Sequence, residues 1–293
     1  MTAAASTALY ANYKKFIRSR ASFWKPKIHA DLQRMIKNAM DEPTIEAAIS
    51  KLDTNMLEPS GLAITLKNIY VDAGRVWGSK IYQVVKKQAA DMTRRAGNGK
   101  KQETLTVRTT HLQKAMMPIG YNEELIAEII SYLRLHDLQM VSEISDTMKA
   151  WIMDRLIEGQ RNGLSITQVA ENIVNDDFPA NRAIVIARTE TVKAANFGAM
   201  QAAKKSGFRL EKEWIAAKDI RTRRIPRDEF SHTAMNGKTA QMDEAFLVPN
   251  RNGSHDSLMQ PCDPAGNPAD VIQCRCTVGF NVLRGADGLP QKG

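Results

Sequence analysis

The 293-residue chain is long enough for about two domains, and its 43% hydrophobic and 25% charged residues are typical of a globular protein. No uncharged apolar run approaches the roughly 18 residues that cross a bilayer, which argues against an integral membrane protein. The net charge of +9 favours an acidic partner. The first residues lack a basic leader followed by a solid apolar stretch, so we expect no signal peptide and a compartment that keeps thiols reduced.

The first 160 residues predict a succession of helices. Tyr10, Tyr13 and Ile17 form an apolar stripe at helical spacing, with lysines and arginines between them. Such stripes are far more often core or partner-helix contacts than cofactor sites, so we predict a helical region over residues 1–160. Further apolar patterns predict helices over residues 43–56, 60–92 and 121–159, with a polar, glycine-containing loop over residues 94–104.

The pattern changes at Gly163. Two more helices are predicted, over residues 163–176 and from residue 180 to a C-cap at Gly207. Alternating apolar and polar residues then predict strands in "LEKEWIAA" and "TVGFNVL", separated by loops rich in Pro, Gly, Asn and Asp. The predicted fold class is α+β, with a helical N-terminal region, a small α+β module over residues 163–282 and a flexible tail over residues 283–293.

Basic residues gather in three blocks. Lysine and arginine outnumber aspartate and glutamate by eight to one over residues 14–37 and over residues 75–101, and by nine to three over residues 204–227. These blocks are consistent with phosphate contacts, which make binding salt-dependent and insensitive to base sequence. A solvated, solubilising surface is the other interpretation. The candidate DNA-contacting residues are Lys14, Lys15, Arg18, Arg94, Arg95, Arg223 and Arg224.

The chain has three cysteines, all in its last third. Cys274 and Cys276 point to the same side if the chain is extended, because side chains alternate along a strand. Such a pair can supply two of the four ligands of a tetrahedral zinc ion, with the other ligands drawn from His232, His255 or Cys262. The alternative is two reduced cysteines packed in a small domain. A cysteine nucleophile is disfavoured, because no recognisable motif surrounds any of the thiols.

Two further polar motifs precede the cysteines. In "KDIRTRRIPRDEFSH", Asp219 is expected to cap a turn or to pair with Arg221 or Arg223. In "ARTET", Arg188 with Glu190 is expected to lock a long helix onto the following domain. Phosphate binding by the arginines of the first motif, and a solvated helix face for the second, are the competing interpretations.

In this order the motifs resemble the phage head morphogenesis family, the Mu F-like minor head proteins. The resemblance covers about residues 163–282 and rests on "SITQVA", "IARTET", "WIAAKDIRTR", "HTAMNGKT", "DEAF" and "CRCTV". The chain departs from the pattern in the longer step "RIPRDEF", in Gln273 before "CRC", and in Cys262, which has no counterpart. The positions that match the pattern are Arg188, Thr189, Glu190, Trp214, Asp219, Arg221, Thr222, Arg223, His232, Gly237, Cys274, Arg275 and Cys276.

The resemblance implies a minor capsid protein of a tailed bacteriophage, located at the portal inside the head and in the host cytoplasm during assembly. Residues 1–160 are then expected to form its assembly and portal-docking region. The expected partners are the portal protein, capsid or scaffolding proteins and packaged double-stranded DNA bound without sequence specificity, with no membrane before DNA delivery. The expected role is structural, with no cofactor beyond a structural zinc at Cys274, Cys276 and His232. The rival interpretation is a metal-dependent nuclease or other DNA-modifying enzyme that uses His232, Asp219 and the C-terminal cysteines. A third is a DNA-binding module without a capsid role.

Overall fold

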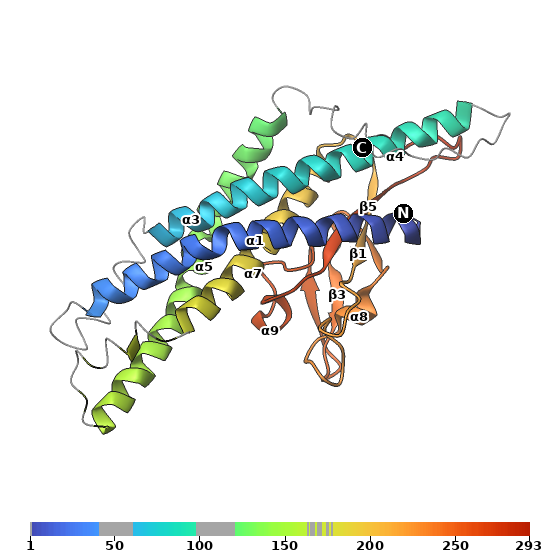
Figure 1. Ribbon diagram of the computed structural model, residues 1–293. Helices are drawn as coiled ribbons and strands as arrows, with labels where there is room; N and C mark the ends of the chain where they lie inside the picture. Colours follow the sequence, from blue (N-terminus) through green and yellow to red (C-terminus); the bar gives the residue numbers. More distant parts are fainter. Residues whose placement is uncertain are drawn as a thin grey trace. The chain divides into compact units, whose positions relative to one another are not determined.

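The computed structural model describes residues 2–40, 61–97, 121–162 and 178–293, together with five isolated residues between them (Figure 1). Helices make up the N-terminal region, and antiparallel strands form a small C-terminal module, which confirms the predicted α+β class. The helix predicted over residues 43–56 and most of the glycine-containing loop lie outside the described residues. The isolated residues are Leu164, Gln168, Asn172, Ile173 and Asp176.

Long helices account for most of the described N-terminal sequence. The apolar pattern predicted as one helix over residues 60–92 is interrupted by a five-residue π-helical turn, η1. The pattern over residues 121–159 forms a single helix. None of the described helices combines the length and the apolar character needed to span a membrane. The helices are α1 (Ala3–Met40), α3 (Gly61–Ile69), η1 (Tyr70–Gly74), α4 (Arg75–Gly97), α5 (Tyr121–Arg161) and α7 (Phe178–Lys204).

The chain divides into two compact units, each made of separate stretches of sequence. The first unit comprises residues 1–17, 70–129 and 191–293, and the second comprises residues 18–69 and 130–190. N-terminal and C-terminal segments therefore share the first unit. The domain boundary near residue 160, drawn from the motifs, stays a prediction.

A three-stranded antiparallel sheet lies in the first unit. Strand β1 (Leu210–Ile215) is central and pairs with β2 (Thr239–Gln241) on one side and with β5 (Thr277–Val282) on the other. Strands β1 and β5 confirm the two strands predicted from alternating residues. A separate hairpin is formed by β3 (Phe246–Pro249) and β4 (His255–Leu258).

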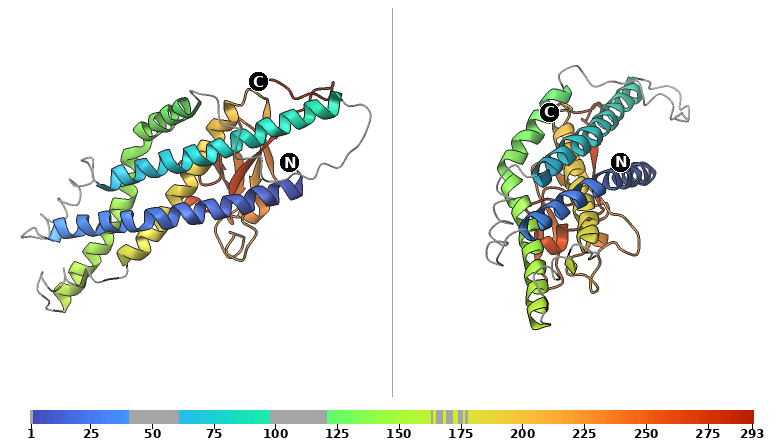
Figure 2. Two further views of the ribbon diagram at one scale, coloured as in Figure 1. Left: turned by 45° about the horizontal axis from the view of Figure 1, so that its top comes forward. Right: turned by 60° about the vertical axis from the view of Figure 1, so that its left-hand side comes forward.

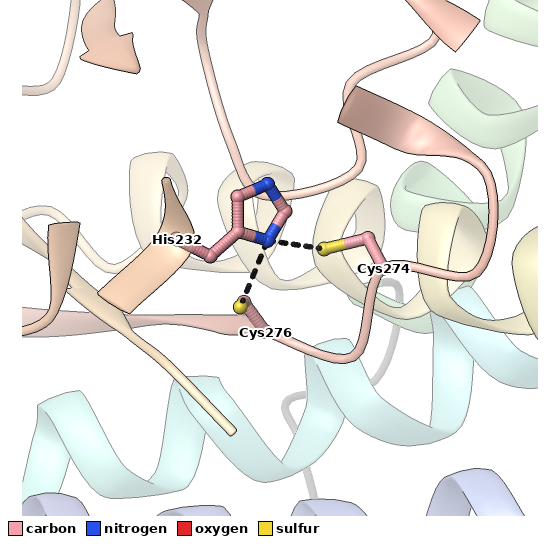
Figure 3. A group of neighbouring side chains, drawn as sticks. All are labelled: His232, Cys274 and Cys276. Atoms are coloured by element: carbon pink, nitrogen blue, oxygen red, sulfur yellow. Dashed lines mark hydrogen bonds between the residues drawn. The ribbon is translucent and has the colours of Figure 1, made fainter. Parts of the chain in front are cut away.

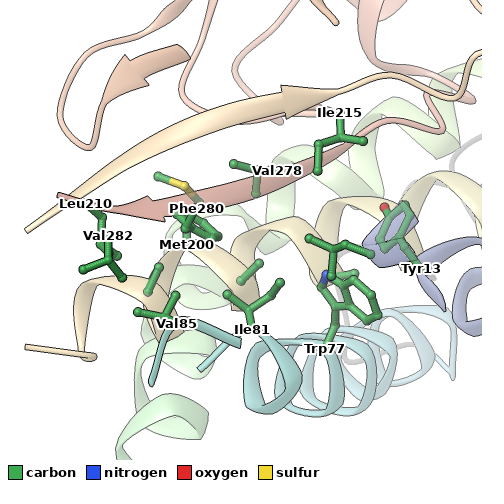
Figure 4. Close-up of a cluster of buried hydrophobic side chains, with 14 of the residues drawn as sticks. Tyr13, Trp77, Ile81, Val85, Met200, Leu210, Ile215, Val278, Phe280 and Val282 are labelled. Atoms are coloured by element: carbon green, nitrogen blue, oxygen red, sulfur yellow. The ribbon is translucent and has the colours of Figure 1, made fainter. Parts of the chain in front are cut away.

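One face of this sheet packs on helices (Figure 4). On β5, Val278, Phe280 and Val282 alternate toward the helices, as a strand with one such face requires. They meet side chains from the C-terminal half of α7, from α4 and from the start of α1, and the sheet lies against α7 in both further views (Figure 2). Tyr13 of α1 and Trp77 of α4 meet edge to face, with ring centroids 5.0 Å apart.

Helices α4 and α7 cross with their backbones in contact. A Cβ atom added at Gly198 would lie 2.0 Å from the carbonyl oxygen of Gly74, and one added at Gly78 would lie 2.6 Å from the carbonyl oxygen of Gly198. No side chain fits at these distances, so glycine is required where the helices cross. Because the two helices meet this closely, α7 packs with α4 against the same core face of the sheet.

A second core forms around Trp214, near the end of β1. Trp214 of β1 packs with the hairpin residues Phe246, Val248 and Leu258, and with all three cysteines. Two short helices, α8 (His232–Met235) and α9 (Pro268–Val271), complete this core.

The C-terminal residues, expected to form a flexible tail, are instead held to the chain before β1. Phe208 and Lys292 form an isolated antiparallel bridge, and the backbone N–H of Arg209 donates to the carbonyl oxygen of Gln291 at 3.0 Å. Backbone hydrogen bonds of this kind oppose fraying, which composition alone does not reveal.

Candidate functional site

His232, Cys274 and Cys276 converge in the second core (Figure 3). The Nδ1 atom of His232 lies 3.7 Å from the Sγ atom of Cys274 and 3.4 Å from that of Cys276. The three side chains are buried, with exposed fractions of 2%, 1% and 1%. Within the part of the chain that the structure describes, no other set of three His, Cys, Asp or Glu ligand atoms comes as close together as these, which all lie within 4.8 Å.

Short local structures place these side chains. His232 opens α8, whose N-cap Ser231 is extended and accepts a hydrogen bond from the N–H of Ala234 at 3.4 Å. Cys274 follows α9 after Gln273, which has a positive φ of 59°, and Cys276 immediately precedes β5. The Cys-Arg-Cys segment is thus an irregular lead-in to a strand, where strand geometry was expected. Its two sulfurs nevertheless face the same imidazole (Figure 3).

Asp270 fixes the orientation of the imidazole. The Nε2 atom of His232 makes a short hydrogen bond to Oδ1 of Asp270, whose side chain is fully buried on α9. Because an ionised carboxylate only accepts, Nε2 carries the proton and donates it. In the neutral imidazole, this leaves the Nδ1 lone pair directed at the two sulfurs. Trp214 covers the ring from the side, with centroids 5.3 Å apart.

Interactions among these ionisable groups oppose the effect of burial, which disfavours their charged forms. Burial alone would lower the pKa of His232, but the charge of Cys274 and the hydrogen bond to Asp270 raise it to about 9. Burial also opposes ionisation of Cys274, yet hydrogen bonds from Cys262 and Cys276 and the charge of His232 bring its pKa well below the ordinary value. Burial raises the pKa of Cys276 well above its ordinary value, and Cys274 adds to the effect. These shifts favour an ion pair between the His232 imidazolium and the Cys274 thiolate.

Cys262 lies next to this group. Its thiol is also buried, and it contacts both the Val271 carbonyl oxygen, at 3.3 Å, and the sulfur of Cys274. Its backbone adopts a positive φ of 64°, which is uncommon for a residue with a side chain. The cysteine that lacks a counterpart in the family pattern is therefore a neighbour of the two that have one.

A cysteine, a histidine and an aspartate in this order resemble a nucleophile, its base and an orienting group. A nucleophile must touch its substrate, however, and the sulfur atoms here belong to side chains that are only 1% exposed. The geometry therefore suits a structural or metal-binding role better than turnover.

Arg275 points away from the sulfurs and binds Asp219. Its guanidinium donates two hydrogen bonds to the carboxylate, one of them to Oδ1 at 2.6 Å. The carboxylate-guanidinium pair expected for Asp219 thus forms with Arg275, while Arg221 contributes only its backbone N–H, at 3.0 Å. The hydrogen bond from Arg275 is the largest of the effects that lower the pKa of Asp219 to about 2. This pair fastens the loop after β1 to the Cys-Arg-Cys segment.

The other residues taken from the motifs lie in different surroundings. Arg188 is exposed, whereas Glu190, two residues further along α7, is buried. Arg223 is half-buried and its guanidinium donates a short hydrogen bond to the Ile272 carbonyl oxygen. Gly237 has a positive φ of 78° in the turn that follows α8, a conformation that favours glycine.

Sequence reasoning missed Asn196, a polar residue buried in the middle of α7. Its side-chain amide donates to the carbonyl oxygens of Pro261, at 2.8 Å, and Cys276, at 3.1 Å, and its oxygen accepts from the hydroxyl of Thr277 at 2.9 Å. These bonds tie the lead-in to β5 to the helix. The available signal was an asparagine within the otherwise apolar run "AANFGAM".

Most candidate DNA-contacting side chains are exposed. Arg94 pairs with Asp91 on the same helix, and Arg223 is engaged as described above. The nuclease interpretation required Asp219 and His255 to approach His232. Asp219 is held by Arg275, and His255 lies at an exposed position on β4. The exposed candidates are Lys14, Lys15, Arg18, Arg94, Arg95 and Arg224.

The fold and the buried His-Cys-Cys group define a small α+β module whose C-terminal strand is locked to its core. Residues 150–279, which include this group, match the family described as phage Mu protein F like protein. The match confirms the resemblance to phage head morphogenesis proteins over this segment. No curated protein and no solved structure matches the chain.

Proposed function

We propose that the protein is a minor capsid protein of a tailed bacteriophage that lies at the portal vertex inside the head and contacts packaged DNA through exposed basic side chains. The family match over residues 150–279 carries this proposal, because it includes the whole His-Cys-Cys group and the Asp219–Arg275 pair. Both features join segments that are distant in sequence, as a rigid assembly module requires.

The charge of α1 supports a contact with DNA. This helix carries eight lysines and arginines and a single acidic residue, Asp31. Lys14, Lys15 and Arg18 lie within five residues of one another and are all exposed. Neutralising phosphates with such side chains releases counterions and favours binding independently of base sequence.

An exposed aromatic residue on the same helix supports docking to a protein such as the portal. The Phe23 side chain is 51% exposed, and the ammonium group of Lys27 lies 4.5 Å from the centroid of its ring. Aromatic residues are enriched at the anchoring positions of protein interfaces.

The capsid role is tested by locating the protein in particles. We expect quantitative mass spectrometry to find it in purified heads, and to find it missing from heads assembled without portal protein. Equal amounts in both kinds of head would contradict the portal location. Absence from heads of both kinds would contradict the capsid role.

The DNA contact is tested with purified protein and double-stranded DNA over a range of salt concentrations. Changing Lys14, Lys15 and Arg18 together to alanine should weaken binding and reduce the slope of log K against log salt by up to about 3, since each phosphate contact contributes about 0.9. A matched control removes the same charges from exposed positions elsewhere, Lys67, Lys238 and Arg251. Equal losses in both variants would contradict a defined DNA surface, and divalent-metal-dependent cleavage of the DNA would support the enzyme instead.

A further inference from the structure

We propose that His232, Cys274 and Cys276 bind a structural zinc ion, with Cys262 as the fourth ligand. The observation is the convergence of an imidazole nitrogen and two sulfurs, all buried, on one point in the second core. Histidine nitrogen and cysteine sulfur are the usual ligands of structural zinc.

The interatomic distances fit a tetrahedral ion. With Zn–S bonds of about 2.3 Å and Zn–N bonds of about 2.05 Å, tetrahedral angles place a ligand nitrogen about 3.6 Å from a ligand sulfur. The two distances from Nδ1 of His232, 3.4 Å to Cys276 and 3.7 Å to Cys274, lie on either side of that value. The distances from the imidazole nitrogen to the two sulfurs are therefore those expected around a shared tetrahedral ion.

The imidazole nitrogen and the two sulfurs share one small buried space. Both sulfurs lie within 4.0 Å of Nδ1 and are shielded from water. A cation placed between the three atoms would interact with all of them at once.

Asp270 supplies the partner that a zinc-binding histidine needs. Histidine ligands almost always donate their second ring N–H to a carboxylate or carbonyl, which fixes the tautomer and strengthens the metal bond. His232 makes this bond through Nε2 to a carboxylate whose side chain is fully buried. The bond leaves Nδ1, the atom that faces the sulfurs, to bind the ion.

Cys262 is the ligand that closes the site. Its buried thiol contacts the sulfur of Cys274, although it lies outside the group of three whose ligand atoms are all within 4.8 Å of one another, so its side chain would move to reach the ion. Structural zinc sites have four protein ligands, whereas catalytic sites keep one position open to water. A third thiol next to the group, in a core where these side chains are 1–2% exposed, indicates a closed structural site.

A zinc ion at this site would cross-link three separate segments of the first unit. It would join the turn after β4, the start of α8 and the lead-in to β5, which are up to 44 residues apart in sequence. Metal binding that exists only in the folded state adds its free energy to folding. This role is independent of the capsid function proposed above.

The test is metal analysis of the full-length protein purified without added metal. We expect about one zinc per chain, and a loss of most of it in Cys274→Ser and in Cys276→Ser. Replacing zinc by cobalt should give the absorption of a tetrahedral site with sulfur-to-metal charge transfer, and Cys262→Ser should reduce that charge-transfer intensity by about one third.

Asp270→Asn provides a variant that keeps all four ligands. It should lower zinc affinity by about 10- to 100-fold, with the thermal unfolding midpoint restored by excess zinc. Asp219→Asn is the matched control, because its carboxylate binds Arg275 outside the group, and it should keep full zinc content. Metal-free protein whose unfolding midpoint does not respond to zinc or chelator would overturn the proposal, whether or not the protein is found in heads. Unchanged cobalt spectra in Cys262→Ser would overturn the fourth ligand alone.

Discussion

At the scale of single residues, the Cys-Arg-Cys segment presents its side chains in two directions. The two sulfurs face His232 (Figure 3). Arg275, which lies between the two cysteines in sequence, binds Asp219. The arginine therefore anchors the outside of the segment and the cysteines anchor the inside. This division of roles explains why an arginine occupies the middle position of an otherwise buried motif.

The Asp219–Arg275 pair predicts a particular dependence of stability on pH. The folded-state pKa of Asp219, about 2, lies below the value of about 3.9 expected when unfolded, so the pair stabilises the fold above about pH 4 and loses this effect as the pH falls toward 2. The side chains are 30% and 25% exposed, so we expect about 1–2 kcal/mol after solvent screening. Urea unfolding from pH 2 to 7 should show Asp219→Asn less stable at pH 7 and level with the unmodified protein near pH 2.

Arg275 and Arg221 allow a direct comparison of the two candidate partners of Asp219. Arg275→Ala should raise the pKa of Asp219 toward its ordinary range, because it removes the hydrogen bonds that lower it most. Arg221→Ala should have little effect, since its backbone N–H remains. An NMR titration of the Asp219 carboxyl in both variants measures this, and equal shifts would count against the pairing seen in the structure.

The sequence identified the residue types of the site more successfully than their partners. Cysteines one residue apart and a histidine within a recognisable motif were sufficient to propose the group of three. Asp270 and Asn196 were missed, because a buried aspartate or asparagine has no spacing signature and its role depends on which carbonyl or imidazole the fold brings to it. Asp219 was expected to pair with a neighbour in sequence, but the guanidinium that fits its carboxylate comes from a residue 56 positions away.

At the scale of elements, the crossing of α4 and α7 depends on three glycines, Gly74, Gly78 and Gly198. Period-two and helical patterns predicted β1, β5 and most helices, because those patterns report on one buried face. They did not predict η1. They also did not predict the crossing, because two helix backbones in contact at glycines leave no apolar side chains for a sequence pattern to detect. The glycines at the crossing are therefore informative only once the two helices are known to meet.

Gly198→Ala tests the crossing. Alanine in place of glycine on an open helix surface stabilises by up to about 1 kcal/mol, but here the new methyl group would meet the carbonyl oxygen of Gly74. We expect destabilisation by about 1–3 kcal/mol or more, as for other overpacked positions. Urea denaturation measures the change, and Gln201→Ala, at a half-exposed position on the same helix, should stay within about 0.5 kcal/mol. A stabilised Gly198→Ala variant would show that the helices do not touch there.

At the scale of the whole molecule, the first unit is assembled from segments of both ends of the chain. The family match covers residues 150–279, but the sheet in that segment packs on α4 and on the start of α1. The motifs therefore mark the polar residues of the module better than they mark its structural limits. Sequence reasoning placed a boundary near residue 160 because motifs begin there, whereas burial of the sheet depends on residues far upstream.

The shared core predicts that the motif-bearing segment will not fold alone. A fragment of residues 178–293 lacks four large buried side chains that cover its sheet, Tyr13, Trp77, Ile81 and Val85. At about 1.5–3 kcal/mol for each, their loss removes about 6–12 kcal/mol, as much as the whole net stability of a typical domain. We expect the fragment to lack a cooperative thermal transition and to be cut rapidly by protease. Co-expression with residues 1–97 should restore protection, because that piece returns both covering helices. A cooperatively folded fragment would mean that the sheet is stable without the N-terminal helices, and that the boundary predicted from the motifs is a true domain boundary.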